Sequence, residues 1–174
     1  MIAVGDLRVV GIDPGPTPGV VVLDLCDRAD SEGRWLDYAH VAQVSVDLAD
    51  SLLTSLLLAH HAPVGSALVA VEAFVHSRKG RSGASRVTRD LVPVLRATTS
   101  SYGAAFVERQ ASQVKAWATD ERLDRAAFRV SDRWVNLLDL TKGMRHARDA
   151  ARHALFAACR DGQLPDPLSK AWSR

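Results

Sequence analysis

Two carboxylates in this sequence follow strongly apolar runs of the kind that form buried strands. Asp13 comes directly after the run at 7–12, and Glu72 lies near the end of the run at 67–74. A buried carboxylate without a partner costs several kcal/mol, so each of these acids needs a basic group or a metal ion. If the two strands are neighbours in one sheet, the two acids can face each other at its edge.

A third carboxylate lies in the alanine-rich segment 143–158, GMRHARDAARHALFAA, whose composition favours a helix. At about 100° per residue, His146, Asp149 and His153 fall within about 60° of one another around that helix. The helix can therefore present one carboxylate and two imidazoles to the two acids at the strand ends.

This set of ligands is typical of a site for hard divalent cations. Oxygen-rich ligands suit Mg²⁺ and Mn²⁺, and Mn²⁺ tolerates imidazole better. Two such ions about 3.5 to 4 Å apart can stabilise the attacking water and the leaving oxygen of a phosphodiester. Each residue alone is more often a cap, a surface histidine or half of an ion pair, so the interpretation depends on their occurring together. We interpret the pattern as a site for metal-assisted phosphodiester hydrolysis.

Periodicity predicts the elements that position these residues. The runs at 7–12 and 19–25 are separated by a Pro/Gly turn, which predicts an antiparallel hairpin. Further strands are expected at 35–44, 67–74 and 104–108, helices at 47–61 and 85–100, and helical structure in the remainder. Pro93 is expected to kink the second helix or to mark a late start. This is the order of an RNase H-like α/β fold, whose central five-stranded mixed sheet has three antiparallel and then two parallel strands and is flanked by α-helices.

The length of 174 residues is that of one ordinary domain. We expect a nuclease domain over 1–160 and a C-terminal tail over 161–174, for which disorder is the default. Cys26 and Cys159 lack a zinc or disulfide spacing, and the N-terminus lacks a signal-peptide pattern. No apolar stretch reaches about 18 residues. The sequence therefore predicts a soluble cytoplasmic protein without a membrane partner.

The net charge of +2 hides an uneven distribution. Residues 1–77 hold three Arg against ten Asp and Glu, whereas residues 78–174 hold nineteen Lys and Arg against ten acids. The second half is therefore the better candidate for binding a polyanion, although solvated helix faces give the same pattern.

Four motifs occur in the order GIDPG (11–15), VAVEAF (69–74), ERQASQVKAW (108–117) and HARDAARHAL (146–155). Together they resemble the RuvC family of Holliday junction resolvases, especially its bacteriophage members. The resemblance spans almost the whole domain. It implies an RNase H-like fold, a homodimer, and cleavage of four-way junctions and other branched DNA with two Mg²⁺ ions, for which Mn²⁺ can substitute. A phage-encoded member would act in the cytoplasm of its bacterial host.

The resemblance also implies roles for single residues. Asp13 corresponds to the acid that bridges the two metal ions, Glu72 to the second acid, and His146 with Asp149 to the pair on the helix. Some members have Asp at the position of His146, which leaves open whether His146 binds metal or helps to protonate the leaving group. His153 is interpreted as a support behind the ligands or a phosphate contact.

The segment after the second acid enters the junction in this family, and here it reads FVHSRKGRSGASR (74–86). Basic side chains near the metal ions would neutralise phosphates. Phe74 could stack on an unpaired base, and is equally well explained as a core residue. Lys115 matches a lysine that lies near the active site in the family. The predicted DNA-binding residues are Phe74, Arg78, Lys79, Arg81, Arg86 and Lys115.

The expected activity is hydrolysis to 5′-phosphate and 3′-hydroxyl ends. A YqgF-type nuclease that processes structured RNA would have similar acids and stays as an alternative. The segment 13–17 also fits the D-x-G-x-T phosphate loop of actin-like, sugar-kinase-type ATP-binding domains. Those proteins need a second domain, for which we expect no room here, and the sequence has no P-loop. We therefore expect no nucleotide cofactor. A catalytically silent junction-binding protein would leave the acids unexplained.

Overall fold

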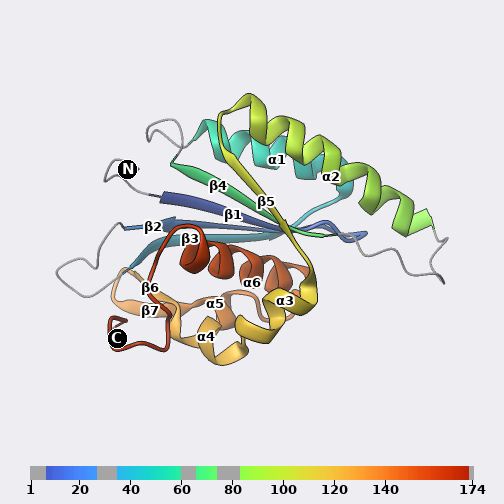
Figure 1. The fold of residues 1–174 in the computed structure, drawn as a ribbon. Coiled ribbons are helices and arrows are strands. Elements are labelled where there is room, and N and C mark those ends of the chain that lie inside the picture. The colour runs from blue at the N-terminus through green and yellow to red at the C-terminus, as the bar shows by residue number, and fades with distance from the viewer. Residues whose placement is uncertain (1–6, 27–34, 60–65, 74–82, 173–174) are drawn as a thin grey trace.

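Five strands form one mixed sheet at the centre of the computed structural model, which describes residues 7–26, 35–59, 66–73 and 83–172 (Figure 1). The order across the sheet is β3-β2-β1-β4-β5. The strands are β1 (Leu7–Asp13), β2 (Gly19–Leu25), β3 (Leu36–Gln43), β4 (Ala67–Glu72) and β5 (Ala105–Arg109). β1 pairs antiparallel with β2 and parallel with β4, β2 pairs antiparallel with β3, and β4 pairs parallel with β5. The predicted sheet of three antiparallel and then two parallel strands is confirmed.

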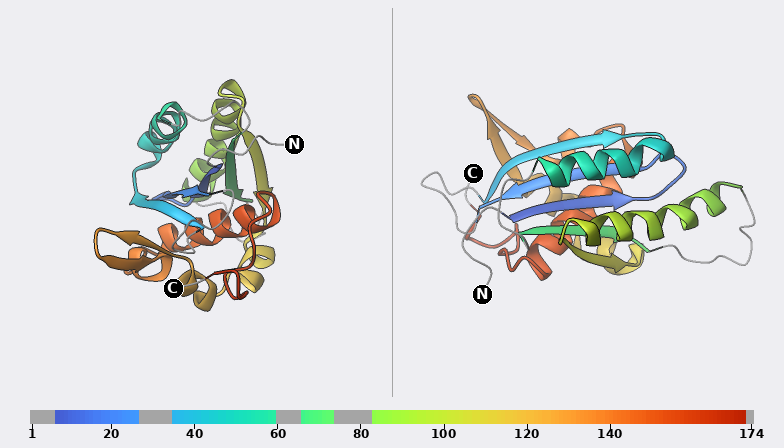
Figure 2. Two further views of the ribbon diagram at one scale, coloured as in Figure 1. Left: turned by 90° about the vertical axis from the view of Figure 1, so that its left-hand side faces the viewer. Right: turned by 90° about the horizontal axis from the view of Figure 1, so that it is seen from above.

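Helices cover both faces of the sheet, as Figure 2 shows. The helices α1 (Val46–Leu58) and α2 (Gly83–Ser101) lie on one face, and the central helix of the other face is α6 (Arg145–Arg160). Leu23 and Leu155 belong to the core between the sheet and α6. Ile12 and Leu53 belong to the core under α1 and α2. Side chains alternate between the faces of a strand, so burial on both faces explains why β1 and β2 are almost wholly apolar.

Small residues bring α6 into backbone contact with the sheet. A Cβ atom on Gly11 would collide with the carbonyl oxygen of Ala150, and one on Gly19 with the carbonyl oxygen of His146. The buried side of the helix is mostly alanine, at Ala147, Ala150, Ala151, Ala154, Ala157 and Ala158. The distance of α6 from the ends of β1 and β2 is therefore set by residues that have little or no side chain.

α2 begins at Gly83 and continues through Pro93 as one helix, so the alternative of a late start at the proline is wrong. In the parts of the chain that the structure describes, no helix combines the length and the hydropathy needed to cross a bilayer.

The expectation that the chain after β5 is wholly helical is wrong in one segment. Helices α3 (Ala111–Trp117), α4 (Asp120–Arg125) and α5 (Leu137–Leu140) do occur there, but the hairpin β6 (Ala127–Val130) and β7 (Arg133–Asn136) separates α4 from α5. Phe128 is buried and packs edge-on against the ring of Tyr38 on β3. Ser131 takes the left-handed conformation, with φ of 53°, in the turn. Strands of four residues are too short for their periodicity to be distinguished from that of a helix.

The C-terminal segment packs on the domain as far as Trp172. The Trp172 side chain is buried in the core next to α6, and its Nε1 donates a hydrogen bond of 2.9 Å to the carbonyl oxygen of Pro165. Trp35 Nε1 donates to the carbonyl oxygen of Ala171 at 2.9 Å. These contacts attach the segment after residue 160 to the rest of the domain.

Candidate active site

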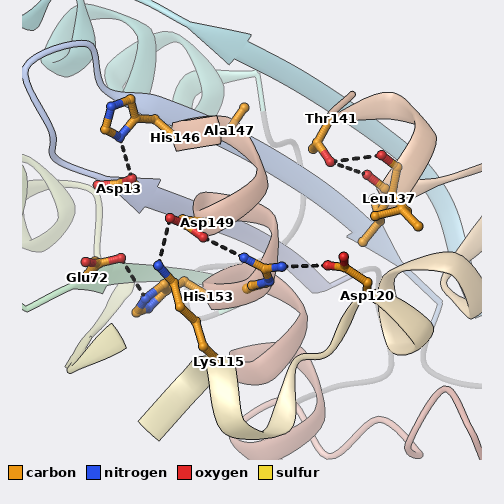
Figure 3. A network of polar contacts seen from close by, with 12 residues as sticks. Asp13, Glu72, Lys115, Asp120, Leu137, Thr141, His146, Ala147, Asp149 and His153 are labelled. Carbon is orange, nitrogen blue, oxygen red and sulfur yellow. Dashed lines mark hydrogen bonds and ion pairs between the residues drawn. The ribbon is translucent and has the colours of Figure 1, made fainter. Parts of the chain in front are cut away.

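Three carboxylates from three elements converge at one end of the sheet (Figure 3). Asp13 and Glu72 are the last residues of β1 and β4, and the parallel register of these strands pairs Ile12 with Val71. Asp149 lies in the second turn of α6. One carboxylate oxygen of each acid lies within 4.8 Å of the other two. The structure thus brings together the three acids that the sequence analysis singled out.

Asp13 is a buried member of this cluster, with 8% of the residue exposed. Burial raises the pKa of its carboxyl group; a hydrogen bond from His146 opposes the shift, while the charges of Glu72 and Asp149 add to it. The net direction is upward, so among the described residues burial and the two neighbouring acids outweigh the stabilising contact of His146. A bound cation would stabilise the ionised form.

His146 contacts Asp13 directly. Its Nδ1 lies 2.7 Å from Asp13 Oδ2, at hydrogen-bond distance. Gly15 leaves the space for the imidazole, because a Cβ atom there would lie 2.7 Å from the ring Cε1. Gln43, the last residue of β3, accepts hydrogen bonds from the backbone N–H of His146 at 3.1 Å and of Ala147 at 3.3 Å. Gln43 therefore satisfies donors in the first turn of α6 and fixes the position of His146.

Asp149 is held at both oxygens. Lys115 Nζ donates to Oδ2 at 2.8 Å, and Arg152 donates to Oδ1 at 2.7 Å. The other end of the Arg152 guanidinium donates to Asp120 Oδ1 at 2.5 Å. Burial raises the pKa of Asp149, but the hydrogen bonds and charges of Lys115 and Arg152 outweigh it and hold the pKa below its ordinary value. Asp149 is therefore a carboxylate with a fixed orientation and a stable negative charge.

Glu72 faces His153, whose side chain is almost fully buried, and the distance from His153 Nε2 to Glu72 Oε2 is 3.5 Å. Both atoms are buried, and neither makes a hydrogen bond within the described part of the chain. An acceptor in this situation is costly unless something binds to it. His153 thus lies next to Glu72, and the supporting role expected for it stays a prediction.

For five of the six predicted DNA-binding residues, the structure gives no description of the side chain. Phe74, Arg78, Lys79 and Arg81 lie outside the described residues, and Arg86 lies in α2 with a side chain that is not described. Lys115 lies at the site through its contact with Asp149.

Sequence reasoning missed Gln43, Arg152 and Asp120. Gln43 lies 103 residues from His146, and Asp120 lies 32 residues from Arg152. Contacts this distant leave no local pattern. Arg152 lies three residues after Asp149 on the predicted helix, a spacing at which ion pairs form, and this was the one available signal.

The mixed sheet and its flanking helices form an RNase H-like α/β fold of the RuvC type. Two solved structures of RuvC from Thermus thermophilus are similar to the chain. One, in complex with a Holliday junction substrate, has a TM-score of 0.58 and 21% identity, over 90% of this chain and 96% of that chain. The other has a TM-score of 0.56 and 20% identity, over 90% and 97% of the two chains. No family model and no curated protein matches the sequence. The resemblance to RuvC is therefore confirmed at the level of the fold.

Proposed function

We propose that the protein is a metal-dependent endonuclease that cuts four-way junctions and other branched DNA and leaves 5′-phosphate and 3′-hydroxyl ends. The observation that carries the proposal is the convergence of Asp13, Glu72 and Asp149 at the edge of a RuvC-type sheet. One of the similar solved structures is a RuvC protein with a Holliday junction substrate, which supports branched DNA as the substrate class.

The residues fit divalent metal ions. Three carboxylates supply the hard oxygen ligands that Mg²⁺ and Mn²⁺ prefer. The buried Glu72 Oε2 has no hydrogen-bond partner in the described part of the chain. Burial, together with the charges of Glu72 and Asp149, raises the pKa of Asp13, and a bound cation would stabilise its ionised form. We propose two Mg²⁺ ions, both held by Asp13, one shared with Glu72 and the other with Asp149 and His146. Bound metal ions would polarise the scissile phosphate and lower the pKa of the attacking water.

The remaining polar residues orient these ligands. Arg152 and Asp120 fix one oxygen of Asp149, and Lys115 holds the other. The side chain of Lys115 is 39% exposed, so its ammonium group can also reach a phosphate oxygen of a bound strand. His146 contacts Asp13 through Nδ1, which leaves its other ring nitrogen for the proposed metal ion.

We also propose that the protein acts as a homodimer in a bacterial cytoplasm, as a host or a phage-encoded protein. The described part of the chain contains one acidic cluster of this kind. Resolution of a four-way junction requires paired nicks in two symmetry-related strands, which two subunits related by a two-fold axis can supply.

A panel of substrates tests the proposal. A four-way junction, a replication fork, a flap, plain duplex and a structured RNA are each incubated with Mg²⁺, with Mn²⁺ or with EDTA. Symmetric metal-dependent nicks in the four-way junction support the proposal, and equal cutting of all branched DNA broadens it to a debranching nuclease. Cutting of RNA alone supports the YqgF-type alternative. Absence of metal-dependent cutting in every substrate contradicts the proposal.

A further inference from the structure

A basic hollow of about 410 Å³ lies beside the acidic cluster, between the start of α6, the segment that precedes it and α3. Four of the side chains that line it are basic, namely Lys115, Arg145, Arg148 and Arg152, and one is acidic, Asp149. Asp149 therefore belongs both to the acidic cluster and to the wall of the hollow. Figure 3 shows Thr141, another lining residue, to the right of Asp149, with Asp13 and Glu72 to its left.

Two of the four basic side chains are already neutralised. Lys115 pairs with Asp149, and Arg152 pairs with Asp149 and Asp120. Among the described residues, no acidic side chain pairs with Arg145 or Arg148. The hollow thus contains two guanidinium groups whose charge no acidic side chain in the described ranges balances, next to the position where the substrate would be cut.

Arg148 also has an unused donor. Its Nε is buried and makes no hydrogen bond within the described residues, which costs free energy unless a ligand or water accepts the hydrogen bond. Guanidinium groups present several donors in a plane and match the oxygens of a phosphate. The positive end of the α6 dipole lies at the same place and adds to the attraction for an anion.

We propose that this hollow binds a backbone phosphate of the DNA strand that is being cut, next to the scissile phosphate, through Arg145 and Arg148. The inference rests on the proposed function, because the shared wall at Asp149 places the bound phosphate beside the acidic cluster. The sequence motifs gave neither arginine a role. A phosphate held there would fix the register of the strand over the carboxylates, while Lys115 and Arg152 keep Asp149 in place.

The test measures junction binding as a function of salt concentration. The full chain carrying Asp13→Asn is used in EDTA, so that binding is observed without cutting. Adding Arg148→Gln or Arg145→Gln is expected to raise the Kd about five- to tenfold at about 0.1 M salt. Each is expected to reduce the slope of log K against log salt by about one, the value for one lost phosphate contact. Arg148→Lys keeps the charge and should restore most of the slope.

Arg133→Gln is the matched control, because it removes an exposed arginine from β7, outside the hollow. Arg145 is exposed, so its substitution leaves the packing intact even if that of Arg148 does not. The inference is overturned if Arg145→Gln leaves the salt slope unchanged, or if Arg133→Gln reduces it equally. If the parent chain binds no DNA, the inference and the proposed function both fall. If it binds with the expected slopes but never cuts, the hollow stands and the nuclease proposal falls.

Discussion

Asp13 is placed where its charge is unfavourable for the folded protein. Its pKa is raised by burial and by the neighbouring acids, so ionisation costs the native state more than the unfolded state. The free-energy cost of this ionisation is absent at low pH, where Asp13 is protonated in both the native and the unfolded state. It is largest at pH values above the raised pKa. A site that binds cations is expected to carry such an imbalance, because the metal ions and not the protein complete the neutralisation.

Replacement of Asp13 by asparagine should therefore stabilise the metal-free protein while it abolishes cleavage. Asn can still accept the hydrogen bond from His146 and removes the buried charge. We expect the free energy of unfolding to rise by about 1 kcal/mol at pH 7. The gain should shrink as the pH falls toward the ordinary carboxyl pKa. Urea denaturation in EDTA at several pH values measures this, and a loss of stability at pH 7 would show that the charge of Asp13 is compensated by the protein.

Asp149 behaves in the opposite way. Its pKa is lowered, because Lys115 and Arg152 outweigh the effect of burial, so the ionised form stabilises the native state. This stabilisation is present above the unfolded pKa, near 3.8, and is lost as the pH falls through the lowered folded value.

Arg152→Met should reduce the free energy of unfolding by about 2 kcal/mol at pH 7, since it leaves a buried carboxylate with one partner in place of two. The variant and the parent should become more alike in stability as the pH falls below the unfolded pKa. Arg133→Met, which removes an exposed arginine on β7, is the control and should have little effect. Equal effects of the two substitutions in urea denaturation would contradict the role assigned to Arg152.

At the scale of the elements, the approach of α6 to the β1–β2 hairpin determines the geometry of the site. Two glycines allow this approach in different ways. A Cβ atom on Gly19 meets the backbone of α6, whereas one on Gly15 meets only the imidazole of His146. A backbone cannot move aside without moving the helix, but a side chain can rotate.

Gly19→Ala should therefore destabilise the protein by about 3 kcal/mol, the upper end of the usual cost of overpacking. Gly15→Ala should cost less than about 1 kcal/mol but displace His146 from Asp13 and slow cleavage about tenfold. Thermal unfolding and cleavage rates of the two variants provide the comparison. If Gly15→Ala cuts at the parental rate, the contact between His146 and Asp13 has no part in the reaction.

The same scale shows what the sequence could predict. The β-branched runs and the alanine-rich helix have long, clear periods, so β1, β2, β4 and α6 could be placed together with the acids that they carry. The hairpin β6–β7 could not, because its strands have four residues each. Gln43 and Asp120 act through contacts between residues far apart in the sequence, so only the spacing of Arg152 from Asp149 left a local signal. The acids and His146 were thus predictable from their own elements, and Lys115 from the resemblance, whereas Gln43, Arg152 and Asp120 were missed.

At the scale of the whole molecule, the C-terminal segment belongs to the folded body. The side chain of Trp172 lies in the core next to α6, and the segment carries Asp166, which pairs with Arg122 of α4 at 2.8 Å. The segment after residue 160 therefore contributes to the packing that holds α6 in place.

Trp172→Ala should lower the free energy of unfolding by about 3 kcal/mol, the cost typical of removing a buried aromatic side chain. Leu168→Ala, in the same segment, removes an exposed side chain and should cost less than about 0.5 kcal/mol. Chemical denaturation of both variants makes the comparison. Similar small effects for the two would contradict the role of the Trp172 side chain in the core.

The central claim is that Asp13, Glu72 and Asp149 together hold the metal ions that cut branched DNA. The most direct measurement is Mg²⁺-dependent cleavage of a four-way junction by the parent, by Asp13→Asn and by the control Asp132→Asn, whose acid is fully exposed on the β6–β7 turn. We predict symmetric nicks with 5′-phosphate ends from the parent and the control, and junction binding without cleavage from Asp13→Asn. Undiminished cleavage by Asp13→Asn would contradict the account.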